Sequence, residues 1–505
     1  MRPPETIRET SCDLATSWRT LHQQNRSWPV RKVFRLPAWV WLLTAALLVR
    51  GAFSENPVLT PFAAVLLPVF AALLWRADEP PVLVFACAMQ WLQAAAGILY
   101  ANTFSATLSE LFNGPELERA TWLSLVGVAV NALGMKVMLF HLPSAAANPS
   151  RIRGSQINVA NAFIFYLGCF VVATIAERFA FALPSLAQPI YAVASLKWVA
   201  IFVLFYSVIQ QRSGYGLLGI AVMIEFGIGL LGYFSSFKSV FFVLLVTALT
   251  SAGLRRKQLV TTVAIAAILF TTGIVWSAIK QDYREFLNKG TEQQQVLVPM
   301  EERAVKLGEL VANVSWESFT NGLESMVLRV SQVSLFAYTI MNVPDSIPYA
   351  RGALWLDAVK RVVTPRVLFP DKAVVDDSER TNLYTGIGVA GTAQGTSIGI
   401  GYMAESYVDF GPMFMFVPIF FLGMFYGFIY RLFVFARHRV LGYGVATAIL
   451  TFGACSIDTS NIKVVGGNLA VLLVLGTLYL AFGRAFIEWL TLGDDALRVE
   501  GHSVR

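Results

Sequence analysis

One stretch of the sequence, residues 358–411, combines the side chains that could carry out chemistry in an otherwise apolar chain. Its carboxylate Glu405 stands at the mouth of a long apolar run, where partial desolvation would raise its pKa and make it a credible proton acceptor. The cations that precede it are Arg361, Arg366, Lys372 and Arg380. Guanidinium groups bind phosphate oxygens in bidentate fashion, and lysine adds a point charge. A base near such cations at a membrane surface suits a lipid diphosphate substrate.

Three further polar residues are candidates for the same site. Arg329 interrupts an apolar run, and Lys238 lies in the turn SSFKS, where an outward lysine departs from the usual charge bias of membrane proteins. Asp458, in the turn ACSIDTSNIK, is a second candidate base. A structural role competes in each case, because acids cap helix ends, lysines reach toward lipid phosphates, and neighbouring Asp and Glu residues neutralise loop cations.

The sequence does not indicate metal or disulfide chemistry. Histidine is scarce and the acidic clusters lack metal-ligand spacing, so we expect no bound metal and no cofactor. The four cysteines are scattered, which is typical of small core residues. Glu225 lies deep within an apolar run and needs a partner, for which Lys197 and Arg178 are the candidates.

The elements that must position these residues are membrane helices. Hydrophobic residues make up 56% of the 505-residue chain and charged residues 14%, against about 25% charged in a typical soluble domain. Apolar runs long enough to cross ~30 Å of hydrocarbon recur along the chain. They lie near 37–54, 57–75, 81–101, 120–141, 157–179, 188–209, 215–234, 238–254, 258–279, 411–431, 441–459 and 466–488. The sequence therefore predicts an all-α polytopic membrane protein with about twelve transmembrane helices.

Basic residues orient these runs. They fall on alternate connections: the N-terminal segment, Arg76, Arg151 and Arg153, Arg212, Arg255, Arg256 and Lys257, and Arg431, Arg437 and Arg439. Placing them all inside satisfies the positive-inside rule, so both termini are expected in the cytoplasm. We expect a basic cytoplasmic segment 1–36, nine spans in 37–279, a large extracytoplasmic segment 280–410, three spans in 411–488 and a cytoplasmic tail 489–505.

The predicted outer segment contains amphipathic helices. One is expected to begin after Pro299 and a second at Ser315, the second running on until Pro344. A shorter helix is expected over 352–363. Residues 383–401 are rich in Gly, Thr and Ser, which allows close backbone approach or a mobile cover over a site.

Several boxes in this half of the chain resemble the oligosaccharide repeat-unit polymerases, the Wzy-type polymerases of bacterial surface polysaccharides. The boxes are VLRVSQ, VPDSIPYARGALW, TPRVLFPDK and ESYVDFG, and the turn SSFKS with Lys238 is similar to a lysine-bearing turn of that family. The matching positions are Arg329, Gly352, Pro365, Arg366, Pro370, Lys372, Glu405, Tyr407, Phe410 and Gly411. The resemblance covers roughly residues 225–430.

The resemblance implies a metal-independent glycosyltransferase on the periplasmic face of the bacterial inner membrane. Such an enzyme moves a growing glycan from undecaprenyl diphosphate onto a new lipid-linked repeat unit. Glu405 would be the base, with Asp458 in reserve. The residues expected to bind the diphosphate and glycan are Arg329, Arg361, Arg366, Lys372, Arg380, Lys238 and Tyr407. Candidate partners are membrane lipids and the flippase and chain-length regulator of the pathway, whereas no nucleic acid is expected.

Three other functions stay open at this point. A ligase that transfers a finished glycan would have similar architecture and chemistry. A transporter or flippase would carry charges along several spans toward a midplane cavity and have symmetric halves, whereas this chain concentrates its polarity on one face. A scaffold of a polysaccharide assembly complex is the third.

Overall fold

The computed structural model of the chain describes residues 36–112, 114, 116–140, 157–182, 187–232, 236–250, 256–291, 296–364, 369, 376–391 and 396–491. Arg366 and Lys372 lie outside these residues, as do Arg151, Arg153, Arg255 and most of both predicted terminal segments. Every regular element of the described part is a helix, which confirms the all-α prediction.

Seven stretches of helix are long and apolar enough to cross a membrane. They are formed by α4 (Val82–Thr103), α6 (Leu117–Leu139), α7 (Val159–Ala182), α8 (Ala187–Ala194) followed directly by α9 (Leu196–Gln211), α12 (Arg256–Leu287), α19 (Phe416–Val434) and α21 (Asn461–Thr491). Shorter apolar helices are α2 (Ala38–Ala52), α3 (Leu59–Leu74), α10 (Tyr215–Leu231), α11 (Lys238–Thr250) and α20 (Arg439–Gly453). The described apolar runs are thus largely helical, except that the run 441–459 ends as a helix at Gly453 and continues as the loop 454–460. The total of about twelve spans stays a prediction.

The remaining helices are short. They are α5 (Leu108–Phe112), α13 (Met300–Ala312), α14 (Trp316–Val330), α15 (Ser334–Asn342), α16 (Ala353–Val363), α17 (Asp377–Thr385) and α18 (Gly401–Phe414). As predicted, α13 follows Pro299, and α14 is capped by Ser315, whose hydroxyl accepts the Ser318 N–H at 3.0 Å.

The single helix expected from Ser315 to Pro344 is wrong. The chain leaves the helical conformation at Ser331, and the Gln332 N–H donates to the Gln93 carbonyl of α4 at 3.1 Å. A bond to another helix replaces the next intrahelical bond, so α14 ends and α15 starts in a new direction.

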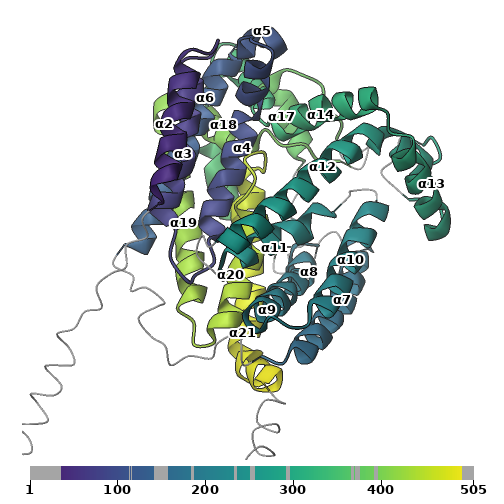
Figure 1. Cartoon of the computed structure of the whole chain (residues 1–505). Helices are drawn as coiled ribbons and strands as arrows, with labels where there is room; N and C mark the ends of the chain where they lie inside the picture. Colours follow the sequence, from purple (N-terminus) through teal and green to yellow (C-terminus); the bar gives the residue numbers. More distant parts are fainter. Residues whose placement is uncertain are drawn as a thin grey trace, which may run out of the picture.

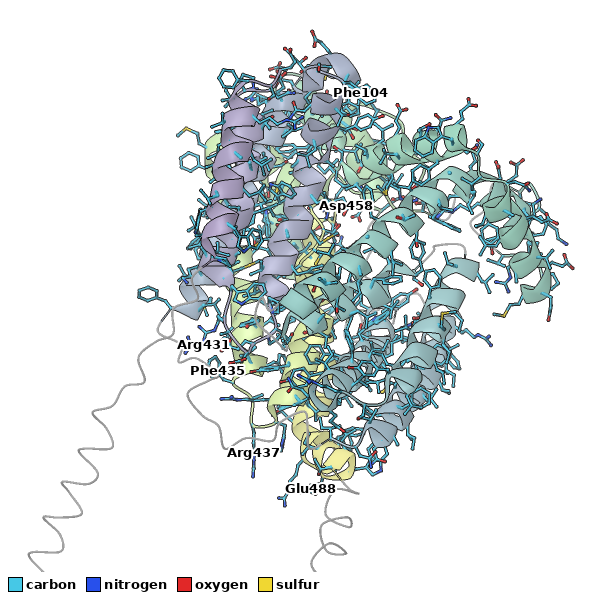
Figure 2. All side chains as sticks on the ribbon, viewed as in Figure 1. Phe104, Arg431, Phe435, Arg437, Asp458 and Glu488 are labelled. Atoms are coloured by element: carbon cyan, nitrogen blue, oxygen red, sulfur yellow. The ribbon has the colours of Figure 1, made fainter. Side chains whose placement is uncertain are left out.

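The described chain begins and ends at the same end of the bundle, the lower end in Figure 1, where α2 starts and α21 finishes. Arg431, Arg437 and Glu488 lie at this end, and Asp458 lies toward the other (Figure 2). Arg76 lies near Arg431. Its guanidinium contacts Glu79 at 2.6 Å, and Glu79 accepts a hydrogen bond from the hydroxyl of Tyr430, the residue before Arg431, at 3.1 Å. These basic connections therefore share one end, as the sequence predicts.

Helices α6 and α19 pack with their backbones nearly touching. A Cβ atom placed on Gly423 would lie 2.1 Å from the Asn131 carbonyl oxygen, and one on Gly134 would lie 2.2 Å from the Phe420 carbonyl. Gly427 follows Gly423 by one helical turn and faces the Met135 carbonyl. Small residues at this spacing let two helices approach closely in a membrane, where apolar side chains gain little from leaving lipid.

Candidate functional site

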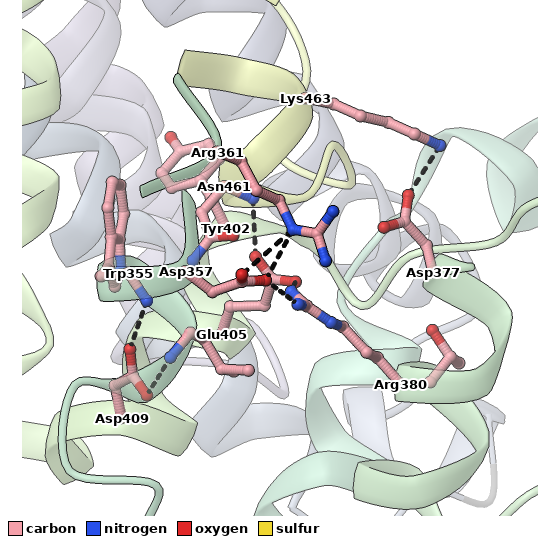
Figure 3. A network of polar contacts seen from close by, with 12 residues as sticks. Trp355, Asp357, Arg361, Asp377, Arg380, Tyr402, Glu405, Asp409, Asn461 and Lys463 are labelled. Carbon is pink, nitrogen blue, oxygen red and sulfur yellow. Dashed lines mark hydrogen bonds and ion pairs between the residues drawn. The ribbon is translucent and has the colours of Figure 1, made fainter. Parts of the chain in front are cut away.

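Glu405 lies on α18 with only 1% of its surface exposed. Its Oε2 accepts the backbone N–H of Asn461, the first residue of α21, at 2.6 Å (Figure 3). Its Oε1 lies 3.8 Å from Arg380 Nη1. The carboxylate thus faces the positive end of a long helix and a guanidinium, both of which favour its ionised form.

Asp357 of α16 gathers the two arginines of this site. Arg361, one turn further along α16, contacts Asp357 through Nε at 3.0 Å, and Arg380 of α17 contacts it through Nη2 at 2.5 Å. Arg380 therefore bridges Asp357 and Glu405, as Figure 3 shows. Both arginines were expected to bind a diphosphate, but here each is already paired with a carboxylate.

The pKa values of the two acids of this network are shifted in opposite directions. Burial raises the pKa of Glu405 to about 8, although the Asn461 N–H and Arg380 oppose the shift and the nearby carboxylates Asp377 and Asp409 add to it. Asp357 is also partly buried, yet its hydrogen bonds to Arg361 and Arg380 outweigh burial and hold its pKa below the ordinary value. A pKa near neutral pH suits a general base, so Glu405 is the better proton acceptor of the two.

The first residue of α18 needs to be glycine. Gly401 has φ +86°, and a Cβ there would lie 2.1 Å from the Ile457 carbonyl oxygen. The next N–H, of Tyr402, donates to the Thr459 carbonyl at 2.9 Å. This contact fixes the start of α18 against the loop 454–460 and thereby sets the position of Glu405 one turn later.

The loop 454–460 is itself held by α4. The Gln93 amide donates to the Cys455 carbonyl at 2.6 Å and accepts the Ile457 N–H at 3.0 Å. Gln90, one turn earlier, donates to the Ala454 carbonyl at 2.6 Å. Because this loop leads directly into Asn461, two glutamines within an apolar helix position the donor that binds Glu405.

Asp409 lies one turn after Glu405 and fixes α16 rather than facing a ligand. Its two oxygens accept the N–H groups of Leu354 and Trp355 at 3.1 and 2.9 Å, and the Trp355 indole donates to Ser406 at 3.0 Å. Burial raises the pKa of Asp409, and these hydrogen bonds oppose the shift. Asp409 of α18 thus caps the first turn of α16, and this cap holds α16 where its Asp357 can join the network.

Helix α17 covers the site from the other side. Asp376 caps it by accepting the Ser378 N–H at 2.9 Å, and the spacing from Asp376 to Glu379 is that of a capping box. Asp377, 2% exposed, pairs with Lys463 of α21 at 2.6 Å. Lys463 also donates to Ser397 at 3.2 Å, which ties the segment before α18 to the same helix.

Several buried polar atoms around Glu405 lack hydrogen-bond partners within the described residues. They are both amide atoms of Asn461, Ser460 Oγ, Asp377 Oδ1 and Arg380 Nη1. Ser460 and Asn461 are 1% and 0% exposed. Because buried polar groups in folded proteins are nearly always satisfied, such a cluster marks a place where a ligand can complete the bonding.

A second group of cations lies near Asp458 of the loop 454–460. Lys280 of α12 lies within electrostatic range of Arg284, Lys238 and Arg329, and Lys238 in turn is near Asp458. Arg329 and Lys238 are exposed. Among the described residues, no carboxylate lies at ion-pairing distance from Lys238, Lys280 or Arg329.

The other sequence candidates take varied positions. Asp458 is half-buried and accepts a hydrogen bond from the Ser456 hydroxyl. Tyr407 is buried, and its hydroxyl donates to the Val343 carbonyl at 3.2 Å while its ring packs on Phe336. We therefore give Tyr407 a packing role and leave it out of the site.

Away from the site, the expected pairing of Glu225 is confirmed. Its carboxylate lies 3.4 Å from Lys197, which also contacts Glu177 at 3.4 Å.

In the described part of the chain, no group of three or more His, Cys, Asp or Glu side chains is arranged to hold a metal ion.

Sequence reasoning missed five residues that the structure brings to these two groups. They are Asp357, Asn461, Lys463, Lys280 and Arg284. Asp357 could have been found, because an acid four residues before Arg361 predicts an ion pair on a helix. The others carry no local signal, since their partners come from distant helices.

Comparison with known proteins shows one relationship. Residues 132–455, more than half of the chain, match the family described as a domain of unknown function, DUF8712. The matched region contains Glu405, Asp357 and both cation groups, and it ends just before Asp458 and Asn461. No curated protein and no solved structure matches the chain. The chain therefore belongs to the DUF8712 family, whose function is unknown.

Proposed function

We propose that this protein is a membrane glycosyltransferase that polymerises undecaprenyl-diphosphate-linked oligosaccharide repeat units on the periplasmic face of a bacterial inner membrane. A hydroxyl oxygen at the non-reducing end of the new repeat unit attacks the anomeric carbon of the growing glycan. The bond from that carbon to the lipid diphosphate breaks, and the hydroxyl proton passes to a base. The products are a glycan longer by one unit and free undecaprenyl diphosphate.

The observation that carries the proposal is that a buried carboxylate and a group of cations both adjoin the loop 454–460. Burial raises the pKa of the Glu405 carboxyl to about 8, which suits a base. Lys238 lies near Asp458 of the loop, and Lys238, Lys280 and Arg329 lie near one another without described carboxylate partners at ion-pairing distance. A transfer from a diphosphate needs both features, because one end of the reaction loses a proton and the other gains negative charge.

The residues then have separate roles. Glu405 accepts the proton, while the Asn461 N–H and Arg380 stabilise its ionised form. Lys238, Lys280 and Arg329 stabilise the leaving diphosphate, and Arg284 adds to their field. Arg361 and Arg380, paired with Asp357, position the carboxylate side rather than binding phosphate.

The test compares the lipid-linked products of a strain that lacks the protein with those of the complemented strain. We expect single lipid-linked repeat units to accumulate on the periplasmic face without the protein, and a ladder of multiples to return with it. A ligase would instead leave finished polymer on the lipid, and a flippase would leave single units on the cytoplasmic face. Either pattern would contradict the proposal.

A further inference from the structure

The proposed function leaves one buried polar side chain next to Glu405 without an explanation. Asn461 is fully buried, and both atoms of its side-chain amide lack a hydrogen-bond partner within the described residues. The neighbouring Ser460 hydroxyl is 1% exposed and also unpartnered. An amide can make four hydrogen bonds, and this one makes none within the described residues. The buried Asn131 of α6 shares this property, but Asn461 adjoins a candidate base, where a ligand could complete its bonding.

We propose that Ser460 and the side-chain amide of Asn461 bind hydroxyl groups of the acceptor sugar beside Glu405. This inference rests on the proposed function, because it identifies where one of the two glycans of that reaction would bind. The unpartnered atoms adjoin the reacting group, since the Asn461 backbone N–H is itself bonded to Glu405 at 2.6 Å.

The chemistry of the unpartnered atoms selects the ligand class. Asn461 Nδ2 and Arg380 Nη1 are donors, Asn461 Oδ1 and Asp377 Oδ1 are acceptors, and the Ser460 hydroxyl is both. A phosphate would leave the acceptors unsatisfied and be repelled by Asp377, and a metal ion would leave the donors unsatisfied. Sugar hydroxyls donate and accept at once, so they can satisfy both kinds of atom.

The cations near Asp458 have the opposite character. Lys238, Lys280 and Arg329 offer donors and positive charge only, which suits a diphosphate. The two groups therefore divide the substrates by chemistry, with the acceptor glycan at Asn461 and the donor diphosphate at the cations.

Because Asn461 is fully buried, an acceptor can reach it only when a neighbouring element moves. Helix α17 is that element in this inference, and Lys463 of α21 holds it through Asp377 at 2.6 Å. The Lys463 side chain is 45% exposed, so solvent screens its contacts and they can exchange for contacts with a ligand.

Asn468 provides a matched control on the same helix. It is also buried, and its Oδ1 has no partner within the described residues, but its Nδ2 donates to the carbonyls of Gly453 at 2.8 Å and Val464 at 2.7 Å. Loss of the Asn468 amide removes satisfied bonds and should lower the thermal unfolding temperature. Loss of the Asn461 amide removes an unsatisfied group and should leave that temperature unchanged or raise it.

The experiment uses the full-length protein in lipid nanodiscs and two probes. One probe is the repeat-unit oligosaccharide released by mild acid from lipid-linked units, and the other is inorganic pyrophosphate. We expect Asn461→Ala to weaken oligosaccharide binding about tenfold or more, as loss of a buried hydrogen-bonding group does, and to keep pyrophosphate binding. We expect Asn468→Ala to keep both affinities and Lys280→Met to weaken only pyrophosphate binding.

The outcomes separate this inference from the proposed function. If wild-type protein polymerises lipid-linked units and Asn461→Ala binds the oligosaccharide normally, only the Asn461 inference is overturned. The same holds if Asn461→Ala lowers the unfolding temperature and weakens both probes, because that pattern indicates a structural role. If wild-type protein binds neither probe and makes no polymer, both proposals are overturned.

Discussion

The ionisation of Glu405 is set by its burial together with two polar neighbours. Burial favours its protonated form, whereas the Asn461 N–H and the Arg380 guanidinium favour its ionised form. Removal of any one of these shifts the balance in a direction that follows from its charge. The candidate base can therefore be tested by its titration as well as by its deletion.

The first prediction concerns the pH dependence of the reaction. Because the base must be ionised, the rate of polymer formation should rise with pH, with an apparent pKa of about 8. Arg380→Ala removes a nearby positive charge and should move this apparent pKa upward, whereas Asp377→Asn removes a negative charge and should move it downward. Initial rates on purified lipid-linked units across the alkaline range provide the measurement. A rate independent of pH, or identical profiles in both variants, would exclude titration of Glu405.

The same carboxyl predicts a pH dependence of stability. The pKa of Glu405 is about 8 in the folded protein and 4.5 ordinarily, so the folded state binds a proton that the unfolded state releases. This contribution to stability is complete below pH 4.5 and is lost as the pH rises toward 8. Glu405→Gln, neutral at every pH, should unfold with a weaker dependence over that interval. Thermal unfolding at several pH values compares the two proteins, and equal slopes would contradict the assignment.

At the level of residues, the sequence identified Glu405 because an acid before an apolar run is visible locally. It assigned Arg361 and Arg380 to a ligand, and the structure pairs both with Asp357. Asn461 could not be predicted, because its importance arises from the packing of α21 against α18. Unsatisfied buried atoms are a property of the folded molecule and have no sequence signal.

Among the elements, α16 depends on a cap supplied by another helix. Asp409 of α18 accepts the N–H groups of Leu354 and Trp355, where α16 has no side-chain cap of its own. Asp409→Ala should destabilise the fold by about 1–3 kcal/mol and lower the rate by misplacing Asp357. Asp345→Ala, at an exposed acid between α15 and α16, is the control and should change neither. Chemical denaturation and initial rates would test this, and a fully stable Asp409→Ala protein would contradict it.

The contact between α6 and α19 gives a prediction for membrane packing. In Gly423→Ala, the new methyl group would meet the Asn131 carbonyl at 2.1 Å, so the helices must separate. We expect a loss of about 1–3 kcal/mol, as in other overpacked interfaces. Gly219→Ala makes the same chemical change on α10, where no atom lies within 4 Å, and should be neutral or slightly stabilising. Equal unfolding temperatures in detergent for the two variants would show that the close contact is absent.

At the level of the helices, the sequence predicted the starts of α13, α14 and α16 but missed the interruption between α14 and α15. Pro299, Ser315 and Gly352 each precede a helix, because capping residues and proline act locally. The break at Ser331 depends on a bond from Gln332 to α4, so the continuous apolar pattern concealed it. Helix α17 was also missed, although Asp376 and Glu379 carry the capping signal.

Across the whole molecule, the two ends of the described chain lie at the same end of the bundle as Arg431 and Arg437, and Asp458 lies toward the other end. We expect the basic end in the cytoplasm and α13 in the periplasm. A membrane-impermeant maleimide should label Glu301→Cys in intact spheroplasts and Arg437→Cys only after permeabilisation, since both positions are exposed. The described native cysteines are buried and provide little background. The reverse labelling pattern would place the site in the cytoplasm and contradict the proposed function.

Sequence alone predicted the helical class, because hydropathy is additive along a chain, and it placed Arg76, Arg431 and Arg437 on one side, where the structure has them at one end. It could not predict that the cations divide into two groups, one paired with Asp357 and the other near Asp458. That division depends on how α4, α14 and α18 meet the loop, which is set by bonds such as that from Gln93 to Cys455.

The most direct test of the central claim is the polymer made by a strain whose only copy of the protein carries Glu405→Gln. Glutamine keeps the size of the side chain and can accept the Asn461 N–H, but it cannot take up the proton. Loss of a general base costs roughly 10²–10⁴-fold in rate. The account predicts a normally inserted protein, single lipid-linked repeat units in place of the ladder, and no rescue by raised pH. A normal polymer ladder from this strain would show that Glu405 is not the base.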